Sequence, residues 1–201
     1  MKKIMKYIPT IILTLLCSCS DYLDIVPVNV TTLDIVFNNR NTAERYLANC
    51  YHFVPDHGSV KRIPGMGAGH ECWFYTTNDS HFDNEVSFYI ARGLQNIDAP
   101  YANYWDGEGG SNLPMFRAIR ECNIFLDYVR DQHKVNDLTD SERKRWIAEV
   151  NVLKAYYHFF LFEHYGPIPI VDKALPVSTD PEGVKVTRMP VDQIVDYMVK
   201  L

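Results

Sequence analysis

Residues 139–167 read TDSERKRWIAEVNVLKAYYHFFLFEHYGP and carry the clearest helical pattern in the chain. Thr139 and Glu142, three residues later, form a capping-box signature, which marks the amino end of a helix. Gly166-Pro167 marks the other end, after Tyr165. Between these signals the apolar residues recur at helical spacing and predict a buried stripe of Trp146, Val150, Leu153, Tyr157, Phe160 and Leu161.

A second helix is expected immediately before this one. Pro114 suits a first helical turn, and the apolar face that follows consists of Phe116, Ile119, Cys122, Leu126 and Val129. A polar connection joins the two helices, so they are expected to pack as an antiparallel helical hairpin. The fold class that this pattern indicates is mainly α.

The residues before the hairpin divide into a helical segment and a loop-rich segment. A first helix is expected to begin at Asn41 or Thr42, with Asn41 as its cap and Glu44 three residues on, and to end before Pro55. From 56 to 112, turn formers, glycines and aromatics dominate and no helical period is sustained. A long loop-rich insertion in a compact domain is usually functional.

A last amphipathic segment follows the hairpin. It opens at Pro190 and places four apolar residues on one side: Val191, Ile194, Val195 and Met198. The sequence then stops at Leu201 without a cap, so we expect the natural domain or gene to continue.

The amino-terminal residues resemble a secretory signal. Three lysines precede an apolar stretch of about nine residues, much shorter than the roughly 20 that a membrane span needs. This stretch ends at Leu16-Cys17-Ser18-Cys19, which resembles the bacterial lipobox. Residues 1–18 are therefore expected to be a lipoprotein signal peptide and Cys19 the lipidated residue. Leu16 is too large for the cleavage position, which argues against Cys17; the alternative is an ordinary signal peptide with two incidental cysteines.

Processing at Cys19 would leave an extended, lipidated tether over residues 19–40 and a helical domain over residues 41–201. The formal net charge would move from −5 to about −8, because three lysines and no acidic residue are lost. Such an acidic chain is not expected to bind nucleic acid, whose phosphates need cationic contacts. Membrane attachment is expected to depend on the acyl chains.

Cysteine usage gives no disulfide framework. Cys50, Cys72 and Cys122 remain after processing, an odd number that permits at most one internal disulfide. Cys122 lies on a predicted helix face and is expected to be a small buried apolar group.

Four stretches, in order, resemble one known family. They are Tyr22-Leu23-Asp24 after the cysteine, AIRECNIFL at 118–126, AEVNVLKAYYHFFLFEHYGPIP at 148–169 and MPVDQIVDYMVK at 189–200. Together they resemble the SusD/RagB lipoproteins of the Bacteroidetes outer membrane. Family members continue the last stretch into an Asp-Leu pair that is missing here.

The resemblance implies tetratricopeptide-like helical hairpins, and a glycan or other nutrient bound on a loop-built surface. It also implies a SusC-like TonB-dependent transporter as partner, which the lipoprotein caps like a lid, and a lipid-anchored, surface-exposed position on the outer membrane. Members are typically more than twice this length, so the chain corresponds to the amino-terminal portion of a SusD-like fold. The family consists of binding proteins, which implies no enzymatic activity and no cofactor.

Aromatic residues of the loop-rich segment are the candidate ligand-binding residues. Sugar rings stack their apolar faces on flat side chains while amides and carboxylates bind the hydroxyl groups. The candidates are Trp73, Tyr75, Asn78, Tyr101, Tyr104 and Trp105. The alternative is that these aromatics fill gaps between helices, as Tyr156-Tyr157 and Phe159-Phe160 are expected to do.

Other chemistry has weaker support. The glycines of residues 65–69 lack the dinucleotide spacing, and no nucleophile elbow or P-loop occurs. Loop carboxylates such as Asp79 and Glu108 leave a lipid-anchored glycoside hydrolase open as a third function, after nutrient uptake and a structural or adhesive role. The His70 and Cys72 region has no zinc-site spacing, so no metal site is assigned. His158 and His164 do not share a helix face and are expected to be partly exposed.

Overall fold

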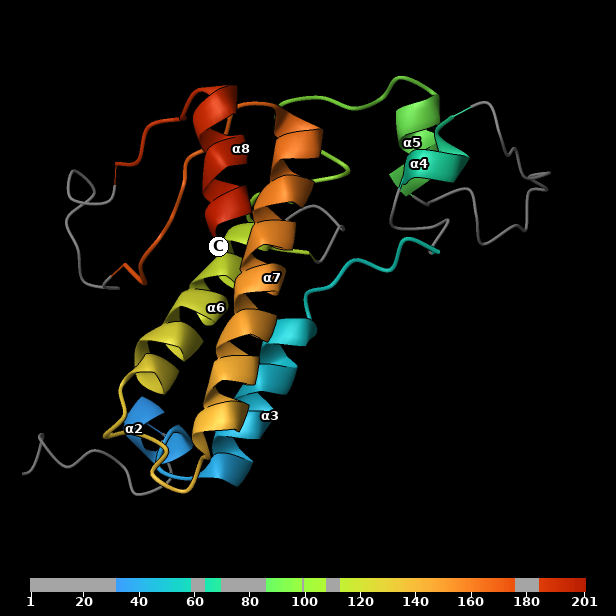
Figure 1. Cartoon of the computed structure of the whole chain (residues 1–201). Coiled ribbons are helices and arrows are strands. Elements are labelled where there is room, and N and C mark those ends of the chain that lie inside the picture. Colours follow the sequence, from blue (N-terminus) through green and yellow to red (C-terminus); the bar gives the residue numbers. More distant parts are fainter. Residues whose placement is uncertain (1–31, 59–63, 70–85, 99, 108–112, 176–184) are drawn as a thin grey trace, which may run out of the picture. The chain divides into compact units, whose positions relative to one another are not determined.

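The computed structural model describes residues 32–58, 64–69, 86–98, 100–107, 113–175 and 185–201. The chain divides into a unit of residues 1–36 and a compact unit of residues 37–201. Regular structure in the described residues is entirely helical (Figure 1): α2 (Leu33–Val36), α3 (Arg40–Tyr51), α4 (Pro64–Gly67), α5 (Val86–Ala91), α6 (Met115–Arg130), α7 (Asp140–Tyr165) and α8 (Val191–Lys200). None of the helices in these ranges combines the length and hydropathy that a membrane span requires.

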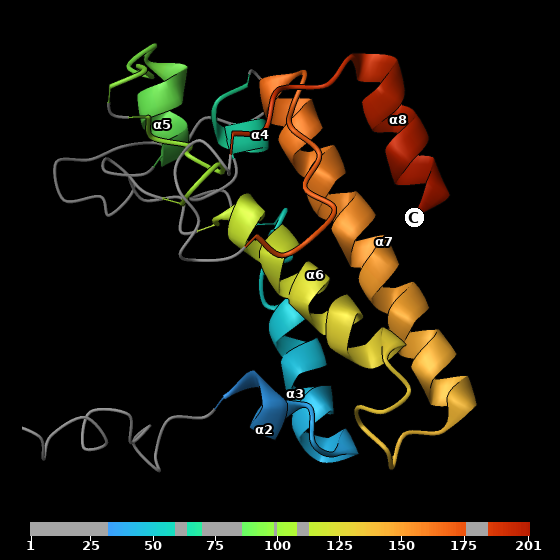
Figure 2. The same cartoon turned by 90° about the vertical axis from the view of Figure 1, so that its left-hand side faces the viewer.

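The predicted antiparallel hairpin is α6 and α7, which lie side by side in Figures 1 and 2. Thr139 caps α7 through the predicted box: its hydroxyl accepts from the Glu142 amide at 3.3 Å, and its own amide donates to the Glu142 carboxylate at 3.4 Å. Gly166 ends α7 at φ 69°, a backbone angle that disfavours other residues. The predicted boundaries of α7 are confirmed.

The predicted stripe of α7 is also confirmed, because all six of its residues are buried. The helix packs against α6, α3 and α8, which explains why further residues are buried outside the stripe. The Tyr157 hydroxyl donates to the Cys50 carbonyl of α3, and burial raises the pKa of this phenol. Phe159 was assigned to packing but is 48% exposed, since it lies on the remaining open side of the helix.

The start of the first long helix differs from the prediction. Asn39, not Asn41, caps α3: its backbone is extended and its side-chain oxygen accepts from the Thr42 amide at 3.1 Å. Asn41 therefore lies inside the first turn. Phe37, assigned to the tether, is 0% exposed and stacks on Tyr128 with ring centroids 4.5 Å apart. The compact unit thus begins at Phe37, and the tether is helical, not extended, over Leu33–Val36.

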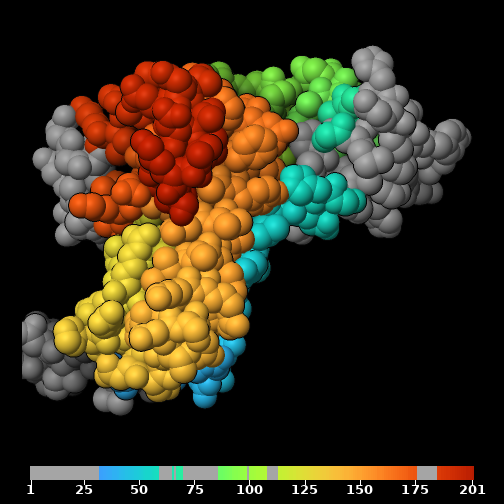
Figure 3. All heavy atoms as spheres, in the orientation of Figure 1, coloured from blue at the N-terminus to red at the C-terminus, as the bar shows by residue number. Residues whose placement is uncertain are grey.

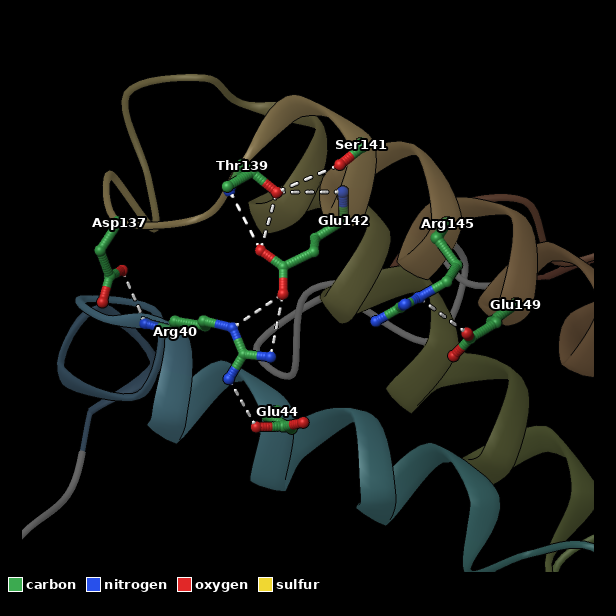
Figure 4. Close-up of polar contacts among 8 residues, drawn as sticks. All are labelled: Arg40, Glu44, Asp137, Thr139, Ser141, Glu142, Arg145 and Glu149. Carbon is green, nitrogen blue, oxygen red and sulfur yellow. Dashed lines mark hydrogen bonds and ion pairs between the residues drawn. The ribbon is translucent and has the colours of Figure 1, made fainter.

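Arg40 ties the start of α3 to the start of α7 (Figure 4). Its guanidinium forms ion pairs of 3.0 Å with Glu142 and with Glu44. Its backbone amide donates to the Asp137 carboxylate at 2.7 Å, in the connection between α6 and α7. Hydrogen bonds from Thr139 and Arg40 lower the pKa of the Glu142 carboxyl, so the capping box and the ion pair stabilise the same charge.

Arg143 holds the connection between α6 and α7 in place. It is 8% exposed, and its guanidinium donates to the carbonyls of Val129 at 2.6 Å, Asp131 at 3.2 Å, Lys134 at 3.1 Å and Val135 at 3.0 Å. The Val129 carbonyl belongs to the last turn of α6, where carbonyls lack helical partners. The arginine therefore caps α6 from its neighbour α7.

Two short helices, α4 and α5, lie in the segment that was predicted to be loop-rich, and they contact each other. The start of this segment contacts α7 through His57, whose ring nitrogen is hydrogen-bonded to the Tyr156 hydroxyl. The glycine-rich stretch at 65–69 follows Pro64 into the four-residue α4.

A polar cluster links α7 to α8, which lie against each other in the space-filling view of Figure 3. Lys154 is 1% exposed and its ammonium pairs with the Asp172 carboxylate at 2.8 Å, which also accepts from the Tyr197 hydroxyl of α8 at 2.8 Å. These two donors lower the pKa of Asp172. Of the predicted α8 stripe only Ile194 is buried, and Val191 and Val195 are 46% and 41% exposed.

His158 lies beneath this cluster and corrects a prediction. It was expected to be partly exposed but is 0% exposed, with its ring edge-on to Tyr197 at 5.2 Å. Its Nδ1 is hydrogen-bonded to the Lys154 carbonyl at 2.7 Å, one turn earlier. Burial lowers its pKa to about 4, so it is neutral at physiological pH.

Candidate functional site

An open pocket of about 330 Å³ lies where the start of α6 meets the segment that follows α7. Phe116 and Arg120 come from α6, and Trp105 comes from the loop before it. The full lining in the described residues is Trp105, Phe116, Arg120, Pro169, Val171, Lys173, Leu175 and Val186. We call this the Trp105 pocket. One wall is aromatic, another is aliphatic, and the charged side chains are both cationic.

The loop that carries Trp105 is fixed at both sides of this residue. The Met115 amide, at the start of α6, donates to the Tyr104 carbonyl at 3.0 Å, and the Tyr104 amide donates to the Tyr165 hydroxyl at 2.8 Å. Gly107 has φ 85°, and a Cβ there would approach Pro114 to 2.9 Å. Because only glycine fits this close approach, the loop returns tightly to α6 immediately after Trp105.

The Trp105 ring packs against three side chains from separate parts of the chain. Phe116 and Tyr165 make edge-type ring contacts at centroid distances of 4.6 and 5.5 Å. The Arg188 guanidinium lies over the ring, 5.3 Å from its centroid, a cation–π geometry. Arg188 also donates to the carbonyls of Pro167 at 2.9 Å and Tyr165 at 3.4 Å. The ring is half-buried and its orientation is fixed.

A second pocket of about 430 Å³ adjoins this aromatic cluster. It is lined by Gln95, Asn96, Ile97, Pro100, Ala102, Asn103 and Tyr165. Tyr165 lines this second pocket and contacts Trp105, which lines the first. Amide side chains can both donate and accept hydrogen bonds, which complements the cations and the indole of the first pocket.

The three predicted ligand-binding residues that the structure describes have three different environments. Trp105 lines the pocket. Tyr101 does not: it is half-buried and stacks on Tyr89 of α5 with centroids 4.4 Å apart. Tyr104 is a core residue, because it is 0% exposed with its ring against Phe160 and His164. A fully buried ring presents no face to a sugar, which corrects the assignment of Tyr104.

Trp73, Tyr75 and Asn78 lie outside the described residues, as does Cys19, and their roles remain predictions. The acidic residues from Asp79 to Glu85, His70 and Cys72 are outside them too. Within the described ranges, no three histidine, cysteine or acidic side chains come together as a metal site. Cys50 and Cys122 are buried free thiols, as expected for Cys122.

Arg120, Lys173 and Arg188 were missed by the sequence analysis. They belong to three different segments of the chain. They gather only because the chain turns back along α6 after Gly166.

Comparison with known proteins identifies the family of this chain. The sequence model of the SusD-like family, described as "Starch-binding associating with outer membrane", matches residues 21–200. The chain belongs to the SusD-like family. A crystal structure of a SusD-like protein from Bacteroides fragilis matches with a TM-score of 0.59 and 16% sequence identity. The match covers 83% of this chain but 29% of that protein. No curated protein sequence matches.

The solved SusD-like structure confirms the mainly α fold that the four sequence stretches predicted. This chain spans less than a third of the length of that protein.

Proposed function

We propose that this SusD-like chain is part of a surface lipoprotein that binds a glycan or similar nutrient and delivers it to a TonB-dependent outer-membrane transporter. The family description, which names starch binding and association with the outer membrane, supports the binding role. The lipobox-like stretch ending at Cys19 supports the anchor. The transporter partnership rests on the resemblance to SusD/RagB lipoproteins.

The observation that carries the binding role is the Trp105 pocket beside its amide-lined neighbour. Saccharide sites combine flat aromatic walls with a few fixed polar groups. Here Trp105 and Phe116 supply the rings, and Gln95, Asn96 and Asn103 supply amides across Tyr165. The hydrogen bonds of the Tyr104 backbone fix the position of the neighbouring Trp105 indole before a ligand binds. This lowers the entropy cost of binding.

The competing functions make different demands. A glycoside hydrolase needs two carboxyl groups about 5 to 9 Å apart, and the described lining of the Trp105 pocket contains no carboxylate. This favours binding over hydrolysis, and measurable turnover of a polysaccharide would reverse it. An adhesive lipoprotein would need no transporter, so a transporter gene immediately upstream would favour uptake.

Replacing Trp105 by alanine is expected to weaken oligosaccharide binding by about 2 kcal/mol, roughly 30-fold in Kd, as for an anchor residue in a pocket. Calorimetric titration with a panel of oligosaccharides measures the change. Phe159→Ala is the matched control, because this aromatic is 48% exposed on α7 and belongs to neither pocket. Trp73→Ala and Tyr75→Ala form the second arm. If affinity falls only in that arm, the ligand site lies on the other predicted aromatics and not at Trp105.

Replacing Cys19 by alanine is expected to release the protein from the membrane fraction or to leave it unprocessed, because the acyl chains supply nearly all of its membrane affinity. Cys17→Ala is the matched control and should behave as the unaltered protein. Metabolic labelling with a fatty acid, followed by fractionation, measures both. Label that persists in the Cys19 variant would show that the anchor lies elsewhere.

A further inference from the structure

The Trp105 pocket is cationic although the chain is acidic. The formal net charge of the chain is −5, yet the charged residues that line the pocket are Arg120 and Lys173. Arg188 brings a third cation against Trp105. Among the described lining residues there is no aspartate or glutamate. A pocket lined by one sign of charge with apolar walls focuses its field on a ligand of the opposite sign.

Asp106, next to Trp105, accepts from the Asn103 amide at 2.5 Å, and the acidic residues next to Lys173 and Arg120 in sequence are engaged elsewhere. Asp172, next to Lys173, pairs with Lys154 and accepts from Tyr197. Glu121, next to Arg120, accepts from the Tyr46 hydroxyl at 2.5 Å and from the Asn49 amide at 3.4 Å, on the side of α6 that faces α3. Asp172 and Glu121 therefore stabilise helix contacts and are not available to neutralise the pocket.

The cations retain donors for a ligand. The Arg120 guanidinium donates to the Leu175 carbonyl, which uses one of the five N–H donors of an arginine. Lys173 is exposed, and within the described residues its ammonium forms no hydrogen bond or ion pair. Arginine and lysine donors have no acceptor capacity, so they favour a ligand group that only accepts.

The position of Arg188 weighs against a neutral sugar. Its guanidinium covers one face of the Trp105 ring, so a sugar that contacts this ring in the pocket lies close to a fixed positive charge. A neutral sugar gains nothing from this charge, whereas an anionic group on the sugar is attracted to it.

We propose that the Trp105 pocket binds an anionic saccharide, one whose ring carries a carboxylate or a sulfate group, with Arg120 and Lys173 contacting the anion. This inference rests on the proposed saccharide-binding function and names its ligand class. The volume of about 330 Å³ is at the low end of the range for ligand sites, roughly 300 to 1,000 Å³. The pocket therefore holds the acidic end of a chain or a single acidic unit, and longer chains continue along the surface.

The test is calorimetric titration of the purified protein with digalacturonate and with neutral digalactose of the same linkage. We expect digalacturonate to bind about tenfold more tightly, because charge-assisted hydrogen bonds are stronger than neutral ones. Sulfated digalactose is a third ligand, and preference for it over digalacturonate would identify sulfate as the group within the same ligand class.

Lys173→Gln is expected to reduce the affinity for digalacturonate about fivefold, the scale of an exposed charge pair, and to reduce the affinity for digalactose by less. Lys144→Gln, an exposed lysine of α7 outside the pocket, is the control with the same change in net charge. Lys173→Arg should restore binding. Thermal melts check that each variant is folded.

Three results would overturn the inference. Equal affinity for the two disaccharides, both weakened by Trp105→Ala, would remove anion selectivity while leaving saccharide binding intact. Equal loss in the Lys173 and Lys144 variants would show a general charge effect and no specific contact. Tighter binding of an acidic peptide of the same charge than of any saccharide would replace the ligand class and remove the proposed function with it.

Discussion

Replacing Tyr157 by alanine is expected to lower the free energy of unfolding by about 3 to 5 kcal/mol, the range for large aromatic core residues. Tyr157 is 0% exposed and lies on the side of α7 that meets α3, where its hydroxyl donates to the Cys50 carbonyl. Alanine would leave a cavity in a region where α3 packs against both α6 and α7. It would also leave the buried Cys50 carbonyl without this donor. Urea denaturation measures the change.

Tyr157→Phe separates the two contributions. Phenylalanine keeps the ring and removes the hydroxyl, so a loss of about 1 kcal/mol is expected for the hydrogen bond alone. Tyr51→Phe, at the exposed end of α3, serves as a surface control for the same chemical change. A loss in Tyr157→Ala no larger than in Tyr157→Phe would mean that the ring adds nothing to the core and that α3 is held by other contacts.

The helical hairpin could be predicted because its signals are local. The capping box of Thr139 and Glu142, the glycine at 166 and the periodic stripe all act within a few residues of the chain, and the structure has them as expected. The start of α3 could not be resolved in the same way. Asn39 and Asn41 are both of a residue type that suits a cap, and the first residue of the observed helix, Arg40, contacts Asp137 and Glu142 about a hundred residues away.

Tertiary packing also decided which loop aromatics are available to a ligand. Tyr104 and Trp105 are neighbours in sequence and equal in aromatic character, yet one is core and the other lines a pocket. The difference comes from the hydrogen bonds of the Tyr104 backbone to Met115 and Tyr165, which turn one ring inward. His158 is a similar case: polar side chains are mostly exposed, but its ring is buried against Tyr197 of α8, far away in sequence.

Replacing Arg143 by methionine is expected to lower the free energy of unfolding by about 2 to 4 kcal/mol, because it removes the donors of several buried carbonyls while keeping most of the aliphatic volume. The loss should appear at the connection between α6 and α7. Val135 holds φ 50° there, a strained angle for a β-branched residue. Its carbonyl is bound by Arg143 at 3.0 Å, and its amide donates to the Phe37 carbonyl at 3.1 Å.

Arg145→Met is the matched control on the same helix. Its side chain is 61% exposed and pairs with Glu149 at 3.5 Å, one turn along α7 (Figure 4). An exposed pair of this kind contributes little, so a change within about 0.5 kcal/mol is expected. Hydrogen exchange locates the effect: amides of residues 131–138 should lose protection in the Arg143 variant and keep it in the Arg145 variant. If both variants unfold at the same urea concentration, the connection is held by the capping box and the Arg40 ion pairs, and the buried arginine contributes nothing to the stability of the hairpin.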